Sequence, residues 1–285
     1  MRLHLVDGTF ELFRAHYAPR PDRPKKATVG VLQSLLGLLA ERAEAVTHVA
    51  VAFDNPIRSF RNDLFEAYKS DEGVPAELRA QFDEVEEAAR AVGVVVWSMK
   101  EFETDDAIAT ACARFAADFE QIRILSPDKD FGQCLQGERV VQIDRVRKKL
   151  TDEKTLRAMR GFGPASVPDW LALVGDTSDG IPGLPGFGDK SAAALLGRFE
   201  HIERIPDDWQ KWPAEVRGRE KLARTLAESR EKVALYKELA TLRTDVPLAE
   251  RADDLRFRGT PRAEFAAWCE RYAAQDLVRR WAAPG

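Results

Sequence analysis

Short apolar runs that end in an acidic residue organise the first half of the chain. Three of them end at Asp7, Asp54 and Asp128, and a fourth, over residues 92–97, is followed shortly by Glu103. Residues 29–45 and 105–119 between these runs carry the apolar spacing of amphipathic helices. Strands alternating with helices predict an α/β fold with a mostly parallel central sheet flanked by helices.

The carboxyl ends of parallel strands meet at one edge of a sheet, and ligands bind in the crevice outside that edge. Taken singly, each acid near these ends could be a helix cap, a turn residue or a solvated loop residue. Together they would repel one another unless cations lay between them, and all-oxygen ligand sets suit Mg²⁺ or Mn²⁺. The candidate metal ligands are Asp7, Asp54, Glu103, Asp105, Asp106, Asp128, Asp130, Asp176 and Asp179.

Composition narrows the class of protein without identifying it. The chain has 285 residues, 45% of them hydrophobic and 32% charged, which is typical of a globular protein with a sizeable core. No apolar run approaches the roughly 20 residues of a membrane-spanning helix, and the first ten residues read as a strand and not as a signal peptide. Three widely spaced cysteines indicate neither a disulfide framework nor a zinc site, so we expect a cytoplasmic protein.

The net charge of −4 argues against a generally basic nucleic-acid binder, but the distribution of charge matters more than its sum. Basic residues gather at Arg145–Lys149 and again between residues 217 and 237. The second group suits a duplex backbone, although a charged surface helix is an equally good interpretation.

A glycine-rich stretch, GLPGFGDKSAA, begins at Gly183 and directly follows Asp176 and Asp179. Small residues ahead of a helix let backbone N–H groups approach a phosphate. A nucleotide-binding P-loop does not fit, because Asp189 separates Gly188 from Lys190 and prolines replace the required strand.

These motifs in this order (LVDGT, VAFD, ETDD, DKDFGQ and GDTSDGIPGLPGFGDKSAA) resemble the 5′ nuclease or flap endonuclease superfamily. In particular they resemble the 5′→3′ exonuclease domain of bacterial DNA polymerase I and its stand-alone relatives, and we expect a stand-alone member. The resemblance implies a PIN-like or resolvase-like α/β core over residues 1–165, with a helical arch at about 58–92. It also implies a helical C-terminal region over 166–285, with a DNA-binding helix–turn–helix motif at about 176–198.

The resemblance implies a structure-specific 5′ nuclease that hydrolyses DNA phosphodiester bonds with two Mg²⁺ ions, which Mn²⁺ can replace. The first ion would be held by Asp7, Asp54, Glu103, Asp105, Asp106 and Asp128, and the second would face Asp130, Asp176 and Asp179. Asp128 and Lys69 would be catalytic. The DNA contacts would come from Arg14, Arg61, Lys69, Gly186, Gly188 and Lys190, with a K⁺ ion at the glycine-rich turn.

The implied substrate is DNA with a 5′ flap, a nick or a 5′ end, bound by a monomer that works alongside DNA polymerase and ligase. The sequence departs from the family pattern at Glu72, where relatives commonly carry arginine, and the resemblance implies weaker capture of the 5′ strand. Arg58, Arg61 and Arg79 are the candidates to replace that arginine. Gly180 also stands where asparagine is usual, and no carboxylate is lost.

Two other classes of protein share part of this pattern. A haloacid-dehalogenase-type phosphatase would have similar VDGT and GDTSD motifs, but its nucleophilic aspartate would fall at residue 5, where this chain has leucine. A flap-DNA-binding protein without turnover would fit Glu72, whereas the complete set of acids favours an enzyme.

Overall fold

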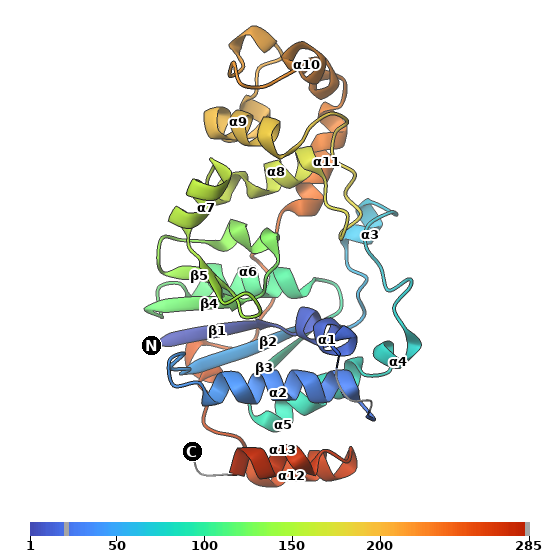
Figure 1. Ribbon diagram of the computed structural model, residues 1–285, viewed down its shortest axis with the longest axis vertical. Helices are drawn as coiled ribbons and strands as arrows, with labels where there is room; N and C mark the ends of the chain where they lie inside the picture. The colour runs from blue at the N-terminus through green and yellow to red at the C-terminus, as the bar shows by residue number, and fades with distance from the viewer. Residues whose placement is uncertain (20–22, 283–285) are drawn as a thin grey trace. The chain divides into compact units, whose positions relative to one another are not determined.

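The computed structural model describes residues 1–19 and 23–282, and the chain forms two compact units (Figure 1). Unit 1 comprises residues 1–57, 71–126 and 244–285, and unit 2 comprises residues 58–70 and 127–243. The chain therefore passes between the units at several points. This grouping by contacts divides the chain differently from the expected boundary near residue 165, which stays a prediction.

Unit 1 is built on parallel strands in the order β3-β2-β1-β4. These are β1 (Arg2–Asp7), β2 (His48–Asp54), β3 (Val95–Met99) and β4 (Gln121–Leu125). The four apolar runs of the first half are these strands. In the β1–β2 pair Asp7 lies opposite Ala52, so both strands run to the same edge with their terminal aspartates. Every residue of β2 is buried, as expected for a strand covered on both faces.

Unit 1 also contains helices. They are α1 (Gly8–Tyr17), α2 (Lys26–Ala40), the short α4 (Ala76–Arg79), α5 (Phe82–Val92), α6 (Thr104–Phe115), α12 (Arg262–Arg271) and α13 (Gln275–Ala282). Helix α6 packs against β1, β2 and β3, while α5 packs against α2 and α12. Helices α12 and α13 bury Phe265, Trp268 and Leu277.

Unit 2 is mainly helical, with α3 (Arg61–Leu64), α7 (Glu153–Arg160), α8 (Val167–Val174), α9 (Asp189–Phe199), α10 (Arg219–Glu228) and α11 (Arg230–Ala240). It also holds the antiparallel pair β5 (Val140–Asp144) and β6 (Lys149–Thr151), which the hydrophobic pattern did not predict. A 3₁₀ turn, η1, covers Lys129–Cys134.

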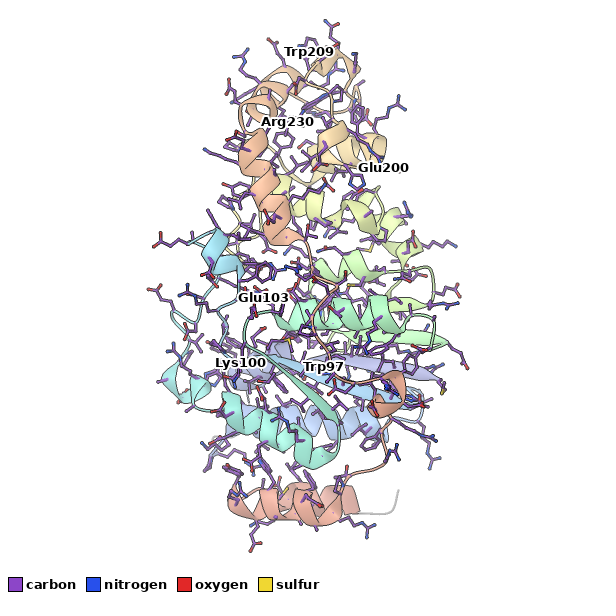
Figure 2. The ribbon with its side chains drawn as sticks, turned by 180° about the vertical axis from the view of Figure 1, so that it is seen from behind. Trp97, Lys100, Glu103, Glu200, Trp209 and Arg230 are labelled. Carbon is purple, nitrogen blue, oxygen red and sulfur yellow. The ribbon has the colours of Figure 1, made fainter. Side chains whose placement is uncertain are left out.

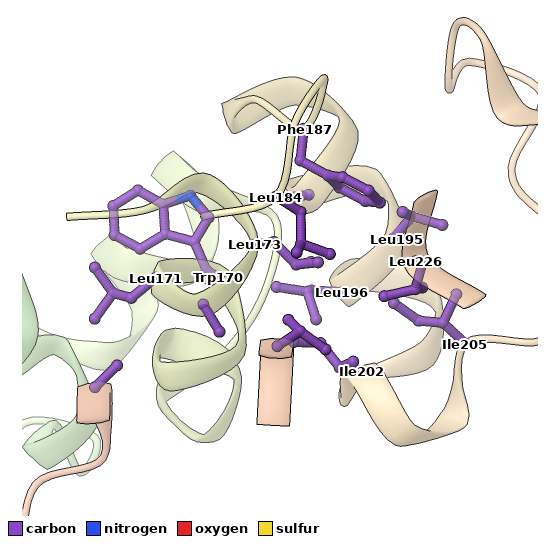
Figure 3. Packing of buried hydrophobic residues seen from close by; sticks show 14 of the residues in the cluster. Trp170, Leu171, Leu173, Leu184, Phe187, Leu195, Leu196, Ile202, Ile205 and Leu226 are labelled. Atoms are coloured by element: carbon purple, nitrogen blue, oxygen red, sulfur yellow. The ribbon is translucent and has the colours of Figure 1, made fainter. Parts of the chain in front are cut away.

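The core of unit 2 lies between α8, α9 and α11 (Figure 3). Trp170, Leu171 and Leu173 of α8 are buried together with Leu195 and Leu196 of α9. Arg230, at the start of α11 (Figure 2), donates to the carbonyls of Ile202 and Ile205 and so fixes the loop after α9. The helix–turn–helix segment thus rests on a packed helical base.

Among the described residues, none of the helices combines the length and the apolar character that crossing a membrane requires.

Candidate active site

Asp7 ends β1 and also caps the next helix. One carboxylate oxygen accepts the backbone N–H of Phe10 at 2.8 Å, and the other accepts the hydroxyl of Ser126 at 2.7 Å. The adjoining Gly8 is required by packing, because a Cβ there would lie 2.5 Å from the carbonyl oxygen of Ala52. Asp7 is therefore held rigidly at the sheet edge, 5% exposed.

Asp54 ends the neighbouring strand and is fixed by two threonines. Its backbone N–H donates to Thr9 Oγ1 at 2.8 Å, and its carboxylate accepts the N–H of Thr104 at 2.7 Å. The two threonine hydroxyls lie 3.1 Å apart. These bonds join the end of β2 to the starts of α1 and α6, so the structure brings Asp54 together with the acids of α6.

Glu103 precedes α6 (Figure 2) and forms a capping box with Asp106. The N–H of Glu103 donates to Asp106 Oδ2 at 3.0 Å, and the Glu103 side chain accepts the N–H of Asp106. Both residues are buried, whereas Asp105 between them is half-buried. We name Asp7, Asp54, Glu103, Asp105 and Asp106 of unit 1 the strand-end carboxylates.

In unit 2, Asp128 and Asp130 flank the start of η1. Asp128 accepts the N–H of Asp130 at 3.0 Å, as an N-cap does. Asp130 is 4% exposed, and its Oδ1 atom is buried without a hydrogen-bond partner among the residues that the structure describes. A buried carboxylate oxygen in that state is costly unless a cation serves it.

Asp176 and Asp179 lie on a tight turn before the glycine-rich stretch. The backbones of Asp176 and Ile181 exchange two hydrogen bonds of 2.8 Å, and Ser178 donates its N–H and hydroxyl to Asp176. Oxygens of Asp130, Asp176 and Asp179 all lie within 4.8 Å of one another. We call these three residues the second acidic cluster, and they are the three acids that the resemblance assigns to the second ion.

Two lysines supply positive charge to this cluster. Lys69 Nζ lies 3.0 Å from Asp179, and its backbone N–H donates to the Asp179 carbonyl at 3.0 Å. Lys129 donates to Asp176, and its Nζ lies 3.9 Å from Asp130. Sequence reasoning missed Lys129, although its place between Asp128 and Asp130 was a usable signal.

The ionisation of the cluster reflects this pairing. Burial, and then the neighbouring Asp128 carboxylate, raise the pKa of Asp130 well above its usual value. Burial also raises the pKa of Asp176, but the hydrogen bonds from Lys129 and Ser178 outweigh it, so that pKa lies below its usual value. Burial lowers the pKa of Lys129, and its bond to Asp176 outweighs that effect and raises it.

Gly180 explains one departure from the family pattern. Its φ is +75°, and a Cβ there would lie 2.3 Å from the carbonyl oxygen of Ala67. Any side chain would therefore push residues 67–69 away from the turn. The close contact of Gly180 with Ala67 therefore places Lys69 next to Asp179.

The glycine-rich turn leads into α9 as expected. Gly186 has a φ of +88°, and Gly188 is the N-cap residue of α9, its N–H donating to Ser191 Oγ at 3.0 Å. Asp189 is anchored by the indole N–H of Trp170 at 3.0 Å. Lys190, the second residue of the helix, is exposed.

Arg61 is a correction to the expected DNA contacts. It is 1% exposed, and its guanidinium donates to the carbonyl oxygens of Leu239 at 2.8 Å and Thr241 at 3.0 Å. The Arg61 guanidinium therefore caps the end of α11 and does not reach solvent. Arg14 pairs with Glu11 of its own helix, and its side chain is 29% exposed.

The segment expected to form an arch is divided between the units, with residues 58–70 in unit 2 and residues 71–92 in unit 1. Glu72 is exposed. The arginines considered as its replacement have partners of their own: Arg58 pairs with Asp63 at 3.1 Å and Arg79 with Asp71 at 3.3 Å.

The donor set of the two groups of acids fits divalent cations. It consists of oxygens, the ligands that Mg²⁺ and Mn²⁺ prefer, and Asp130 Oδ1 is a buried acceptor with no donor. The two lysines beside the second acidic cluster indicate that the site requires positive charge even without an ion.

Comparison with known proteins identifies the family. The 5′-3′ exonuclease N-terminal resolvase-like domain matches residues 2–161, and the 5′-3′ exonuclease C-terminal SAM fold matches residues 162–263. The chain belongs to the 5′-3′ exonuclease family. The family resemblance expected from the motifs is confirmed, and with it the α/β core and the helical C-terminal region.

Among curated proteins, DNA polymerase I of Bacillus caldotenax is 32% identical over 99% of this chain, and that of Pseudomonas aeruginosa is 34% identical over 92%. The chain spans only about a third of the length of these polymerases. A 5′-3′ exonuclease of Aquifex aeolicus is 28% identical over 90% of this chain and 86% of its own length.

Solved structures share the fold at low identity. The phage T5 D15 protein crystallised with metal ions has a TM-score of 0.72 at 16% identity, covering 99% of this chain and 97% of its own. Human GEN1 bound to Holliday junction DNA has a TM-score of 0.65 at 13% identity, covering 98% of this chain and 71% of its own.

Proposed function

We propose that this chain is a structure-specific 5′ nuclease, a 5′→3′ exonuclease and flap endonuclease that hydrolyses DNA phosphodiester bonds with two divalent ions. The observation that carries the proposal is the second acidic cluster, where three carboxylates converge and Asp130 Oδ1 has no donor. Membership of the 5′-3′ exonuclease family supports it. The phosphatase alternative has no such support, because the residue at its nucleophile position, Leu5, is fully buried in β1.

The strand-end carboxylates and Asp128 are proposed to hold the first ion, and the second acidic cluster the second. Two bound ions would activate a water molecule and offset charge on the leaving oxygen. The protein's own contribution is to fix the carboxylates in advance. Asp7 and Asp54 are held by backbone N–H groups and hydroxyls, so they need no rearrangement to accept a cation.

Lys69 is proposed to act on the phosphate that is cleaved. Its side chain is only 22% exposed, and its ammonium lies beside Asp179 of the second acidic cluster. A cation at that point stabilises charge that develops on phosphate oxygens more than it stabilises the ground state. The Asp179 carboxylate and the backbone bond of Lys69 keep the side chain directed to the cluster.

The turn before α9 is proposed to grip the DNA backbone. Gly186 and Gly188 carry no side chain that would obstruct the N-terminus of an 11-residue helix, and exposed Lys190 adds a charge there. A K⁺ ion is proposed at this turn as in the family pattern. Arg14 is proposed as a further DNA contact from α1, whereas Arg61 is left out because it is buried.

The proposed ion, substrate, location and partners follow the family pattern. We propose Mg²⁺ as the natural ion with Mn²⁺ as a substitute, and DNA with a 5′ flap, nick or 5′ end as the substrate. We further propose a cytoplasmic monomer that cooperates with DNA polymerase and ligase.

The test is cleavage by Asp128→Asn, with exposed Asp208→Asn as the control, since Asp208 caps a short 3₁₀ turn and pairs only loosely with Lys211 at 3.9 Å. Labelled 5′-flap, blunt duplex and single-stranded DNA are compared in Mg²⁺, Mn²⁺ and EDTA. We expect cleavage by the wild type and Asp208→Asn in either metal, none in EDTA, and none by Asp128→Asn, which should still bind DNA. Near-wild-type turnover by Asp128→Asn would overturn the two-ion assignment, and binding without cleavage by the wild type would favour a flap-binding protein.

A further inference from the structure

Arg61 is a buried charge to which the function proposed above gives no role. It is 1% exposed, and it is the only lysine or arginine among the buried residues that the structure describes. Its guanidinium lies 4.6 Å from the centre of the Phe60 ring. Removing a guanidinium from water is costly, and an apolar side chain of similar length would fill the same space without that cost. The reason for the charge therefore lies in the contacts that it makes.

The contacts of Arg61 fix the segment of residues 58–70 to the end of α11. Nε donates to the carbonyl of Leu239 at 2.8 Å, and Nη2 donates to that of Thr241, the C-cap residue, at 3.0 Å. The last carbonyls of a helix lack partners within the helix and carry partial negative charge, which suits a cation. Because a guanidinium is planar and its donors lie at fixed angles, two such bonds determine both the distance and the direction of the segment.

The same end of α11 also holds η1, which carries one acid of the second acidic cluster. The side-chain amide of Gln133 donates to the carbonyl of Ala240 at 2.8 Å, and its oxygen accepts the N–H of Leu242 at 3.1 Å. Residues 239–242 are thus bonded by Arg61 from one segment and by Gln133 from another. We call residues 239–242 the α11 anchor, and it sets the spacing of these two segments.

Asn62, the residue after Arg61, links the start of the segment to Lys69. Its side-chain N–H groups donate to the carbonyls of Tyr68 at 3.2 Å and Lys69 at 3.0 Å. Its side-chain oxygen accepts the N–H of Ser59 at 2.9 Å. One orientation of the amide satisfies all three bonds. A displacement of Arg61 from the α11 anchor would therefore be passed on to Lys69.

We propose that Arg61 is a positioning residue for cleavage, which holds the Lys69 ammonium beside Asp179 through Asn62 and the α11 anchor. This inference rests on the proposed nuclease function. The Lys69–Asp179 ion pair, 3.0 Å long, is partly exposed, and such a pair does little to fix a flexible lysine on its own. The path of the segment then decides where the ammonium lies. A displacement of about 1 Å in a group that acts on a reacting phosphate can cost on the order of 100-fold in rate.

The first test reports the position of Lys69 without requiring cleavage. The whole chain is acetylated with an amine-reactive ester in EDTA, and the rate at each lysine is measured by mass spectrometry. Acetylation needs the free amine, which an ion pair with a carboxylate disfavours. In Arg61→Met and in Asn62→Ala, Lys69 should react about fivefold faster than in the wild type, while exposed Lys154 should react at an unchanged rate.

The control for lost stability is Val233→Ala. Val233 is 1% exposed in the core of unit 2 on α11, and it lies outside the α11 anchor. This truncation should destabilise the helix packing through a cavity, as core truncations do. We expect it to leave the acetylation rate of Lys69 and the kcat for a 5′-flap substrate within about twofold of the wild type, because the contacts of Arg61 remain.

The second test is a double-mutant cycle in single-turnover cleavage of a labelled 5′ flap with Mg²⁺. Arg61→Met should lower kcat about 30-fold and change KM less than about threefold, because it displaces a group that acts as charge develops. In a Lys69→Ala background the same substitution should lower kcat less than about threefold, since Arg61 would act through a side chain that is already absent.

The proposal is overturned if Lys69 is acetylated at the wild-type rate in both variants. It is also overturned if Arg61→Met lowers kcat equally with and without Lys69, which would indicate a general structural role. Asn62 is half-buried, so its variant tests the proposal even where Arg61→Met fails to fold. A wild type that cleaves no DNA would overturn the proposed nuclease function, and the acetylation rates would still decide whether Arg61 positions Lys69.

Discussion

The strand-end carboxylates of unit 1 and the second acidic cluster of unit 2 are stabilised in different ways. Asp7 and Asp54 receive backbone N–H groups at helix starts and, for Asp7, a serine hydroxyl. Asp176 also accepts the N–H and the hydroxyl of Ser178, but it and Asp179 receive lysine ammonium groups in addition, and Asp130 has one buried oxygen with no donor among the described residues.

From this difference we expect the stability of the second acidic cluster, and not that of the strand-end carboxylates, to depend on cations. Hydrogen bonds from secondary-structure termini are present whenever the fold is, so the strand-end carboxylates are fixed by the sheet and its helices. The second acidic cluster concentrates charge that neutral donors do not balance, so its stability should respond to lysine side chains and to added metal.

The largest expected effect comes from Asp130→Asn compared with Asp7→Asn. Both should lower cleavage of a 5′-flap substrate by about a thousandfold or more, because both remove a proposed metal ligand. Their effects on stability should have opposite signs. A carboxyl with a raised folded pKa loses stability as the pH rises through that pKa, so Asp130→Asn should raise the free energy of unfolding at pH 7 in EDTA by about 1 kcal/mol.

Asp7→Asn should instead lower the free energy of unfolding by about 1 kcal/mol, because it disturbs the bonds from Phe10 and Ser126. Urea unfolding in EDTA measures both variants. If both variants change the free energy of unfolding by the same amount and in the same direction, the two groups of acids are not stabilised in different ways.

Lys69→Ala should lower kcat about 100-fold or more with a smaller change in KM, since a cation beside the phosphate acts mainly as charge develops. Lys69→Arg should retain part of the activity because it keeps the charge. Single-turnover cleavage of a flap substrate separates the two constants. If Lys69 has only a structural role, Lys69→Ala and Lys69→Arg should lose the same activity, in proportion to their loss of stability.

Lys129→Met should lower the free energy of unfolding in EDTA by about 1–2 kcal/mol, because it leaves Asp176 buried without its ammonium partner. Added Mg²⁺ should restore more stability to this variant than to the wild type. Thermal unfolding across a Mg²⁺ titration provides the measurement, and Lys154→Met, on exposed α7 surface, is the control. An identical response to Mg²⁺ in all three proteins would show that the cluster does not depend on its internal cation.

The smallest effect concerns a carboxylate of unit 1 outside the site. The hydrogen bond with His4, helped by Arg123, lowers the pKa of Glu44 to about 2. A depressed folded pKa contributes stability above the ordinary value of 4.5, and this contribution is lost as the pH falls toward 2. Glu44→Gln should therefore cost about 1 kcal/mol at pH 7 and progressively less between pH 4.5 and 2. Urea unfolding at pH 7, 4 and 2.5 measures the change, and a cost independent of pH would contradict the assignment.

The strands and turns that could be predicted from sequence are those that a short run of neighbouring residues determines. Apolar runs ending in Asp7 and Asp54 predicted strands that reach one sheet edge, and the glycine-rich stretch predicted small residues ahead of a helix, which is where α9 begins. The burial of Arg61 could not be predicted, because its carbonyl partners lie 178 and 180 residues away in the chain. The β5–β6 pair was missed because β6 has three residues, too few for an alternating pattern to register.

The contact of Gly180 with Ala67 has a practical consequence for building chimeric nucleases. Residues 58–70 belong to unit 2, and the backbone bond from Lys69 to Asp179 secures them to the turn that carries the acids. A graft that exchanges the segment up to residue 92 with that of a relative should therefore be joined after Ser70. A junction at residue 58 would replace residues 58–70 with those of the relative. The replaced segment would then have to pass Gly180 along the same backbone path as Ala67 does here.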